Sequence, residues 1–213
     1  MVSIFSLSSL QNQQIEAILS ENKLLRRQIV EKQNLREENE TLRSQFAQTN
    51  SDSQKLIPAK VIGAPGFIPG EASPQFIIID KGEEDGVGAG NVVVLENNLV
   101  GQVTSANKDF SKVILIINGQ TSLSAKSESG TSGIIKGTGG GLVLENVLLS
   151  QDLKKDGLVL TKGDRDEDGG GDPPNLIIGK ITSVERESQD LFQKAQVISF
   201  LDFSNLTHVF ILK

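Results

Sequence analysis

The sequence predicts a mainly β protein in which an N-terminal coiled-coil helix precedes two small antiparallel β-barrel subdomains. Residues 11–48 contain neither proline nor glycine and consist mostly of good helix formers. Beyond Pro58 the chain changes to short runs of β-branched residues separated by Gly, Asn, Asp and Ser, a pattern typical of strands and turns. All nine aromatic residues are Phe, so Ile, Val and Leu must supply most of the core.

The helix carries apolar residues at alternating spacings of three and four, which is the pattern of a coiled-coil seam. Two such sets join through Lys32 by two successive spacings of three, the signature of a stammer. Asn22 and Asn39 occupy core positions of the type where a buried Asn fixes register and favours a parallel dimer. We therefore expect a homodimer, and the alternative is a solvated amphipathic helix that packs on its own globular domain. The predicted dimerisation residues are Ile15, Ile18, Asn22, Leu25, Ile29, Leu35, Asn39, Leu42 and Phe46.

The helix must end in the polar segment before Pro58, because proline cannot continue a helix. About a dozen strands follow without a helix-length amphipathic stretch between them, which favours antiparallel barrels over βαβ units. The predicted organisation is a coiled coil over 1–50, a linker over 51–57, a first β-barrel subdomain over 58–118 and a second over 119–213. Strands are expected in segments 59–64, 75–80, 91–96, 98–106, 111–118, 121–127, 132–138, 141–149, 157–163, 175–185, 194–200 and 208–213.

Glycine and polar residues mark the turns between these strands. The acids and glycines of residues 80–86 predict a solvated turn with positive φ angles. Asn97 and Asn98 tolerate the left-handed conformation of a tight hairpin, and Gly101 suits a bulge or a barrel corner. Folding requirements account for all of these residues.

Composition excludes several classes of function. The formal net charge of -6 gives no electrostatic reason to expect binding to nucleic acid or anionic lipid. The absence of cysteine excludes disulfides, thiolate nucleophiles and Cys-ligated zinc. No apolar run approaches the roughly 20 residues of a membrane-spanning helix, and the first ten residues lack the basic region of a signal peptide.

Paired β-barrels make a serine protease triad worth testing, and the sequence argues against one. The only histidine is His208, close to the C-terminus, and no serine lies in a recognisable nucleophile motif. We therefore expect no catalytic residues, no enzyme activity and no cofactor, and we interpret His208 as a strand-edge residue.

The acidic segment after residue 163 resembles a calcium loop in part. Asp164, Asp166 and Asp168 match alternate ligand positions of an EF-hand loop, and Asp172 matches the ninth position. Asn175 stands where the bidentate Glu belongs, and strands rather than helices flank the segment. We therefore favour a solvated acidic loop without a metal ion.

The proline-rich segment 63–75 contains an apolar pair, Phe67 and Ile68. An exposed pair of this kind would form a partner contact. The same pair would equally serve as a plug that folds back on the mouth of a barrel, and the sequence leaves both alternatives open.

The order of these segments resembles the extracytoplasmic part of the MreC family of bacterial rod-shape-determining proteins. The resemblance begins in "LREENETLRSQ" and continues through "AKVIG", "SKVILIIN", "SGIIKGTGGGLVLENV", "GLVLTKGD" and "IIGKITSV". The block "FIIIDKGEEDGVGAGNVVV" followed by "NLVGQV" is the most telling part. It implies a noncatalytic scaffold of the wall-elongation machinery with a dimerising coiled coil and two small β-barrels.

The resemblance also implies partners and a location. The partners are the elongation-specific penicillin-binding transpeptidase, MreD and, indirectly, the MreB cytoskeleton, and exposed strand edges would let dimers associate into filaments. The location is the extracytoplasmic (periplasmic) face of the inner membrane, with a membrane helix that this chain lacks. The segment "TKGDRDEDGGGDPPN" replaces the family's "TSG…FPPG" loop. The alternative is a periplasmic adaptor of an efflux or secretion system, which would need a second long helix after the first strands.

Overall fold

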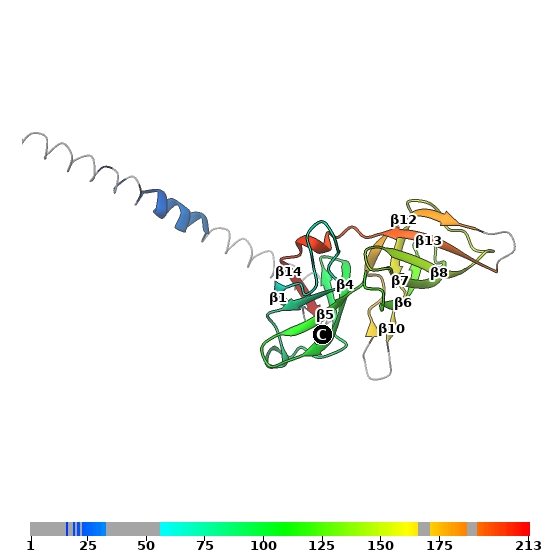
Figure 1. Ribbon diagram of the computed structural model, residues 1–213, viewed down its shortest axis with the longest axis horizontal. Helices are drawn as coiled ribbons and strands as arrows, with labels where there is room; N and C mark the ends of the chain where they lie inside the picture. The colour runs from blue at the N-terminus through cyan, green and yellow to red at the C-terminus, as the bar shows by residue number, and fades with distance from the viewer. Residues whose placement is uncertain are drawn as a thin grey trace, which may run out of the picture. The chain divides into compact units, whose positions relative to one another are not determined.

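The computed structural model describes residues 16, 19, 21, 23–32, 56–165, 171–186 and 191–213, without the side chain of Arg165. The chain divides into two units, Met1–Ser53 and Gln54–Lys213. In the first unit, residues 23–32 form an α-helix, drawn in blue in Figure 1, and every described side chain in it is exposed. Among the described residues, no helix has the length and apolar character needed to cross a membrane.

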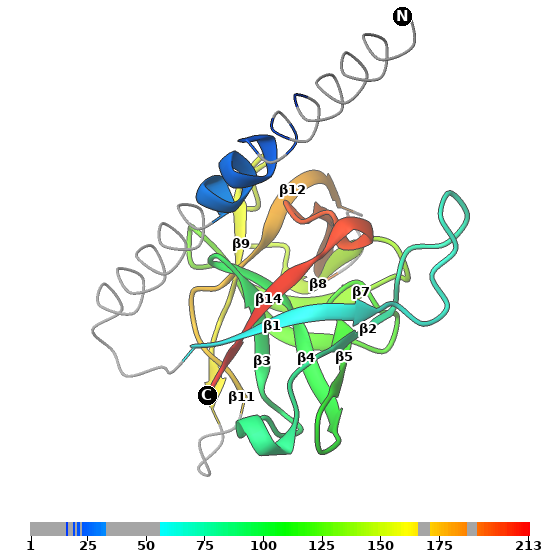
Figure 2. The same ribbon diagram turned by 90° about the vertical axis from the view of Figure 1, so that its left-hand side faces the viewer.

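Six strands of the second unit form a closed barrel. The pairing runs β14–β1–β2–β5–β4–β3 and returns to β14, with every contact antiparallel. Figure 2 shows the first and last of these strands, β1 and β14, side by side. The strands of this first ring are β1 Leu56–Gly63, β2 Phe76–Ile79, β3 Val92–Leu95, β4 Asn98–Ala106, β5 Ser111–Leu115 and β14 His208–Leu212.

Six further strands pair in a second closed ring. Here the order is β6–β7–β8–β13–β12–β9 and back to β6, again with antiparallel contacts throughout. The strands of this second ring are β6 Ser122–Ser127, β7 Ser132–Gly137, β8 Leu142–Leu148, β9 Leu158–Thr161, β12 Ile177–Glu185 and β13 Phe192–Ile198. A separate two-stranded sheet joins β10 Asp164–Arg165 to β11 Gly171–Asp172.

Side chains that point inward and outward alternate along the strands, and the inward ones form the core. In β2 the side chains of Ile77 and Ile79 are fully buried, while Phe76 and Ile78 lie on the opposite face and are half-buried. The same period of two buries every second residue of β13. Most of the core consists of Ile, Val and Leu, as the composition predicts.

Backbone contacts join the two rings. Residues Asn98 of β4 and Ile177 of β12 form a short parallel pairing, and the N–H of Ile177 donates a 2.8 Å hydrogen bond to the carbonyl of Asn97. The N–H of Gly139 donates to the carbonyl of Ile117, also at 2.8 Å. The rings therefore meet through main-chain hydrogen bonds as well as side chains.

The twelve predicted strand segments all overlap the twelve strands of the two rings, which confirms the mainly β fold with a closed barrel. The predicted division after Asn118 falls between β5 and β6, but β14 returns to pair with β1 and β3. Every one of the twelve strands has a neighbour on both sides. The exposed strand edges that we expected are therefore not found along these strands.

One finer expectation is corrected. The left-handed residue of the β3–β4 hairpin is Glu96, with φ of 55°, whereas the expectation named Asn97 and Asn98. The turn of residues 80–86 has the expected positive φ at Gly86, which ends a 3-10 helix, η1 Glu83–Asp85. A second 3-10 helix, η2 Phe203–Asn205, precedes β14. In residues 56–165, 171–186 and 191–213 these are the helical segments, so the second long helix of an adaptor is not found there.

Candidate interaction surface

The described helix exposes the two predicted seam residues that it contains. Leu25 is 48% exposed and Ile29 is 58% exposed, and the two lie one turn apart on the same face. Leu24 and Val30 lie on either side of this face and are also exposed. The other predicted dimerisation residues, Ile15, Ile18, Asn22, Leu35, Asn39, Leu42 and Phe46, lie outside the described residues.

The loop between β1 and β2 separates the predicted apolar pair. Phe67 is half-buried, and Ile68 is 52% exposed. The backbone carbonyl of Ile68 accepts 3.0 Å hydrogen bonds from the N–H groups of Glu71 and Ala72, which fixes the turn around the exposed side chain. Gln75 then ties the end of the loop to the backbone carbonyl of Gly139 through its side-chain amide. The loop thus holds Ile68 in solvent on a fixed turn.

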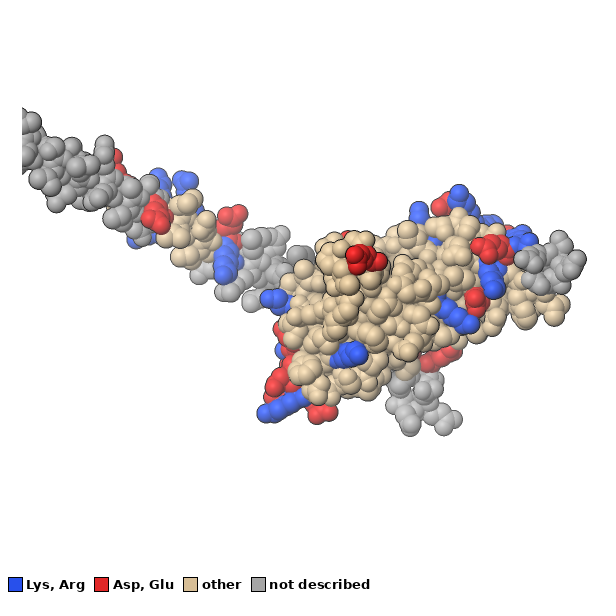
Figure 3. Space-filling view, in the orientation of Figure 1, with Lys and Arg blue, Asp and Glu red and all other residues tan. Residues whose placement is uncertain are grey.

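The outer side of the first ring carries an apolar face, which we define as Ile62, Phe76, Ile78 and Ile114. Ile62 is 55% exposed, and the other three side chains are half-buried on the side opposite the core. Lys112 extends over Phe76, with its ammonium 3.9 Å from the ring centroid, a cation–π contact. Figure 3 shows few charged side chains over β4 and β5, which belong to this ring. This face is not evident from the sequence, because an Ile that points outward from a strand cannot be distinguished there from one that points inward.

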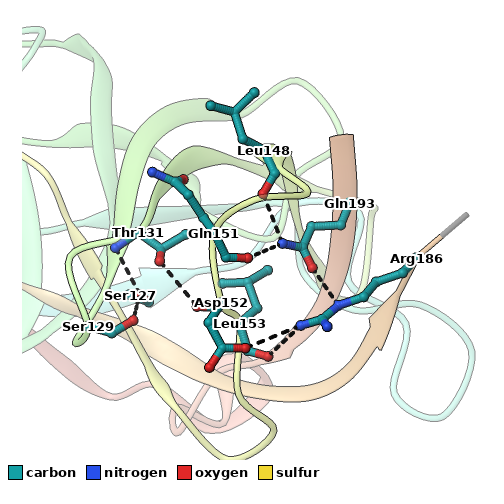
Figure 4. A network of polar contacts seen from close by, with 9 residues as sticks. All are labelled: Ser127, Ser129, Thr131, Leu148, Gln151, Asp152, Leu153, Arg186 and Gln193. Atoms are coloured by element: carbon teal, nitrogen blue, oxygen red, sulfur yellow. Dashed lines mark hydrogen bonds and ion pairs between the residues drawn. The ribbon is translucent and has the colours of Figure 1, made fainter. Parts of the chain in front are cut away.

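A buried glutamine organises one end of the second ring (Figure 4). The side-chain amide of Gln193 donates hydrogen bonds to the carbonyls of Leu148 and Gln151, and its Oε1 accepts from Nε of Arg186 at 2.8 Å. Arg186 also donates to the carbonyl of Leu153 at 3.2 Å. This network fastens the loop that follows β8 to the ends of β12 and β13. The sequence offers no signal for it, since a lone Gln on a strand is ordinarily a surface residue.

The outer face of β8 and β13 carries charges of both signs. Two residues of β8, Glu145 and Asn146, lie opposite the single residue Lys194, and Asn146 has a φ of 58°, which defines a bulge. Glu145 accepts from Lys136 at 2.9 Å and lies 3.7 Å from Lys194. The hydrogen bond from Lys136 lowers the pKa of the Glu145 carboxyl. Figure 3 shows acidic and basic side chains next to one another over these strands.

The described ends of the acidic segment pair as β10 and β11, with Asp164 opposite Asp172. Burial, and secondly the charge of Asp164, raises the pKa of the Asp172 carboxyl. Next to this pair lies Thr161, a fully buried residue whose hydroxyl donates to the carbonyl of Pro173 and accepts from the N–H of Leu176. Asp166 and Asp168 of the predicted loop lie outside the described residues.

His208 lies at the start of β14, opposite Lys60 of β1. Its side chain is exposed, and its Nδ1 is 3.2 Å from the hydroxyl of Thr207. A triad histidine is instead oriented by a carboxylate beside a nucleophile. His208 is thus the first residue of a strand that pairs with β1 on one side and with β3 on the other, and not a residue on an unpaired strand edge.

These features define a mainly β protein, closed into a barrel, that offers surfaces and loops for contact. A family model described as "Rod shape-determining protein MreC, barrel core" matches residues 69–213. The chain therefore belongs to the MreC family, as its sequence resemblance indicates. The "Cell shape-determining protein MreC" of Haemophilus influenzae is 31% identical over 195 residues, covering 85% of this chain and 53% of the relative. The chain thus spans about half the length of that relative.

Solved structures agree with this assignment. One described as "MreC" superposes with a TM-score of 0.69 at 25% identity, covering 84% of this chain and 99% of the other. Another, described as "Complex between Penicillin-Binding Protein (PBP2) and MreC from Helicobacter pylori", has a TM-score of 0.57 at 19% identity. It covers 76% of this chain and 98% of the other, and at this identity it shows the shared fold alone.

Proposed function

We propose that this chain is a noncatalytic scaffold that maintains rod cell shape by organising the enzymes of peptidoglycan synthesis. The observation that carries the proposal is a set of exposed apolar side chains, such as Ile62 and Ile68, on a fold whose twelve ring strands are all paired. Such side chains are typical of contact sites for other proteins. Membership of a family of rod shape-determining proteins supports the same function.

The proposed scaffold is a homodimer joined by a parallel coiled coil over residues 1–50. An exposed Leu25 and Ile29 on one helix face support this part of the proposal, since pairing with a second helix would remove both from water. In this arrangement each ring acts as its own small subdomain, and dimerisation doubles every weak contact that the rings make. Two linked contacts bind more tightly than one through effective concentration.

The proposed partner of the apolar face and the Ile68 loop is the elongation-specific penicillin-binding transpeptidase. The solved structure from Helicobacter pylori is a complex between a penicillin-binding protein and MreC, and it shares the fold of this chain. The apolar face offers what a protein interface needs at its centre, namely apolar side chains, with the side chain of Lys112 lying over Phe76. MreD and, indirectly, the MreB cytoskeleton complete the proposed set of partners.

The proposed location is the extracytoplasmic face of the inner membrane, where a membrane helix outside this chain anchors the scaffold. The coiled coil would then set the height of the rings above the membrane. This location brings the apolar face to the side of the membrane where peptidoglycan is assembled.

Binding of the immobilised full chain to the purified extracytoplasmic domain of the transpeptidase tests the proposal. We expect saturable binding that weakens about 10-fold or more in Ile68→Asp, because a charge would be buried in the contact. Phe110→Asp is the matched control, since Phe110 is a similarly exposed apolar residue on the hairpin between β4 and β5. Absence of binding up to high micromolar concentration would contradict the proposed partner, and equal losses in both variants would contradict the proposed contact at the Ile68 loop.

A further inference from the structure

The run "GTGGG", residues 137–141, forms the hairpin between β7 and β8, at a point where the second ring meets the first. The backbone N–H of Gly139 donates a 2.8 Å hydrogen bond to the carbonyl of Ile117, which follows β5. The carbonyl of Gly139 accepts from the side-chain amide of Gln75, at the end of the β1–β2 loop. Both backbone polar groups of this glycine therefore bind residues that adjoin strands of the first ring.

Close approach accounts for the glycines of this hairpin. A Cβ at Gly137 would overlap the carbonyl oxygen of Asn118. Gly139 has a φ of 91°, which L side chains rarely adopt. An ideal Cβ at Gly140 would lie 3.5 Å from the hydroxyl oxygen of Ser73. The hairpin therefore lies against both the β5–β6 connection and the β1–β2 loop.

Gln75 connects three parts of the chain at this point. Its side-chain amide also donates to the carbonyl of Ser73 at 3.1 Å. Its backbone carbonyl accepts from the N–H of Leu115 at 3.1 Å and from the side-chain amide of Asn118 at 3.3 Å. Asn118 is buried, and its Oδ1 accepts from the N–H of Gln120 at 2.8 Å. The end of the loop is thus bound to the first ring and to the connection that leads into the second ring.

The rest of the β1–β2 loop is bound mainly to itself. The backbone N–H of Phe67 donates to the carbonyl of Ala64, and the turn at Ile68 closes through two further bonds within the loop. Among the residues that the structure describes, the hydrogen bond from Gln75 to Gly139 is the one that joins this loop to the second ring. The position of Ile68 therefore depends on a contact seven residues away.

We propose that Gln75, Asn118 and Gly139 form a latch that couples binding at the Ile68 loop to the placement of the two rings, with Gln75 as the positioning residue. The inference rests on the proposed function, because it assigns regulation to the same contact. Units joined by a small polar interface move relative to each other by default. A partner that binds the latched state more tightly shifts the rings towards it. Because such coupling is reciprocal, fixing the rings in the latched state tightens binding at Ile68.

Hydrogen exchange of the full chain without a partner, followed by NMR, tests the latch itself. Gln75→Met removes the donor and keeps the length of the side chain, so exchange of the Gly139 amide should rise about 10-fold. Gln102→Met is the matched control. Gln102 is also a half-buried glutamine that donates to a glycine carbonyl, that of Gly90 at 3.1 Å, but both residues belong to the first ring and its loops. Exchange at Gly139 should therefore not change in Gln102→Met.

Binding to the extracytoplasmic domain of the transpeptidase tests the coupling. Gln75→Met should weaken binding about 10-fold, whereas Gln102→Met should leave it unchanged. Ser73→Cys with Gly140→Cys allows a disulfide to replace the latch, because the two side chains would be within reach and the chain has no other cysteine. In the Gln75→Met background this disulfide should restore the affinity of the wild type, and its reduction should abolish the gain.

Several outcomes would overturn the inference. Unchanged exchange at Gly139 in Gln75→Met, equal losses of binding in Gln75→Met and Gln102→Met, or a disulfide that restores no affinity would each do so. Circular dichroism and urea midpoints of the variants separate loss of the latch from loss of folding. Failure of the proposed function is a distinct result, because the wild-type chain would then not bind the transpeptidase, and the exchange measurement alone would decide the latch.

Discussion

Arg186 donates a 2.8 Å hydrogen bond from Nε to the buried Oε1 of Gln193, so that a surface arginine satisfies a core glutamine. Among the buried side chains of the described residues, no polar atom lacks a partner. In Gln193 the two amide hydrogens and the carbonyl oxygen are all engaged, which is the condition for burying such a group at little cost.

Gln193→Leu should destabilise the fold by about 2–3 kcal/mol, because the carbonyls of Leu148 and Gln151 lose their donor and Arg186 loses its acceptor. Urea unfolding followed by circular dichroism measures the change. Gln196→Leu is the matched control on the same strand, since Gln196 is exposed, and it should change stability by less than about 0.5 kcal/mol. Equal effects of the two substitutions would show that the network contributes nothing specific.

Gly101→Ala should destabilise the first ring by about 1–3 kcal/mol. A Cβ at this position would overlap the carbonyl oxygen of Ile114, at the point where β4 bulges against β3 and pairs with β5. Gly119→Ala is the control, because a Cβ there meets nothing within 4 Å. Thermal unfolding measures the stability of both variants. An unchanged stability of Gly101→Ala would mean that β4 and β5 can move apart without a loss of free energy.

Asp172→Asn should raise the free energy of unfolding at neutral pH. The raised pKa of Asp172 means that the folded state binds the proton more tightly than the unfolded state. Stability of the wild type therefore falls as the pH rises from the ordinary carboxyl pKa of about 4 through the higher pKa of the folded state. Urea titrations across this range should show the advantage of Asp172→Asn disappearing at low pH, where the wild-type carboxyl is protonated. Asp109→Asn, which removes an exposed carboxylate, is the control, and a pH-independent gain in Asp172→Asn would contradict the assignment.

Leu25→Asp together with Ile29→Asp should weaken dimerisation at least about 100-fold, because each dimer would lose four buried apolar side chains and gain buried charge. Light scattering behind gel filtration measures the mass of the full chain. Val30→Asp is the control, since Val30 is as exposed as Ile29 but lies off the seam. A wild-type chain that is monomeric at micromolar concentration would show that the seam packs with something other than a second copy.

The positions of the strands were predictable because alternation and turn residues are local signals. The hairpin after β3 shows the limit of such signals, since Glu96 takes the left-handed conformation although an Asn follows it. Pairing partners are not local, so nothing in the residues of β14 distinguishes a strand of the second ring from one that closes the first. The burial of Gln193 and the charges of both signs around Glu145 also depend on which strands become neighbours. The surface residues also differ in this way. The exposure of Ile68 depends on a local turn, whereas the apolar face depends on the pairing of β1, β2 and β5.

Closure by β14 has a consequence for the order of events during synthesis. The ribosome releases β1 to β5 first and β14 after all the strands of the second ring, so the first ring has a gap between β1 and β3 until β14 emerges. The second ring is continuous in sequence from β6 to β13 and can close before β14 emerges. Until β14 emerges, β1 and β3 have unpaired backbone groups that can pair with strands of other chains. A chaperone that shields β1 and β3 would therefore protect the nascent chain from aggregation.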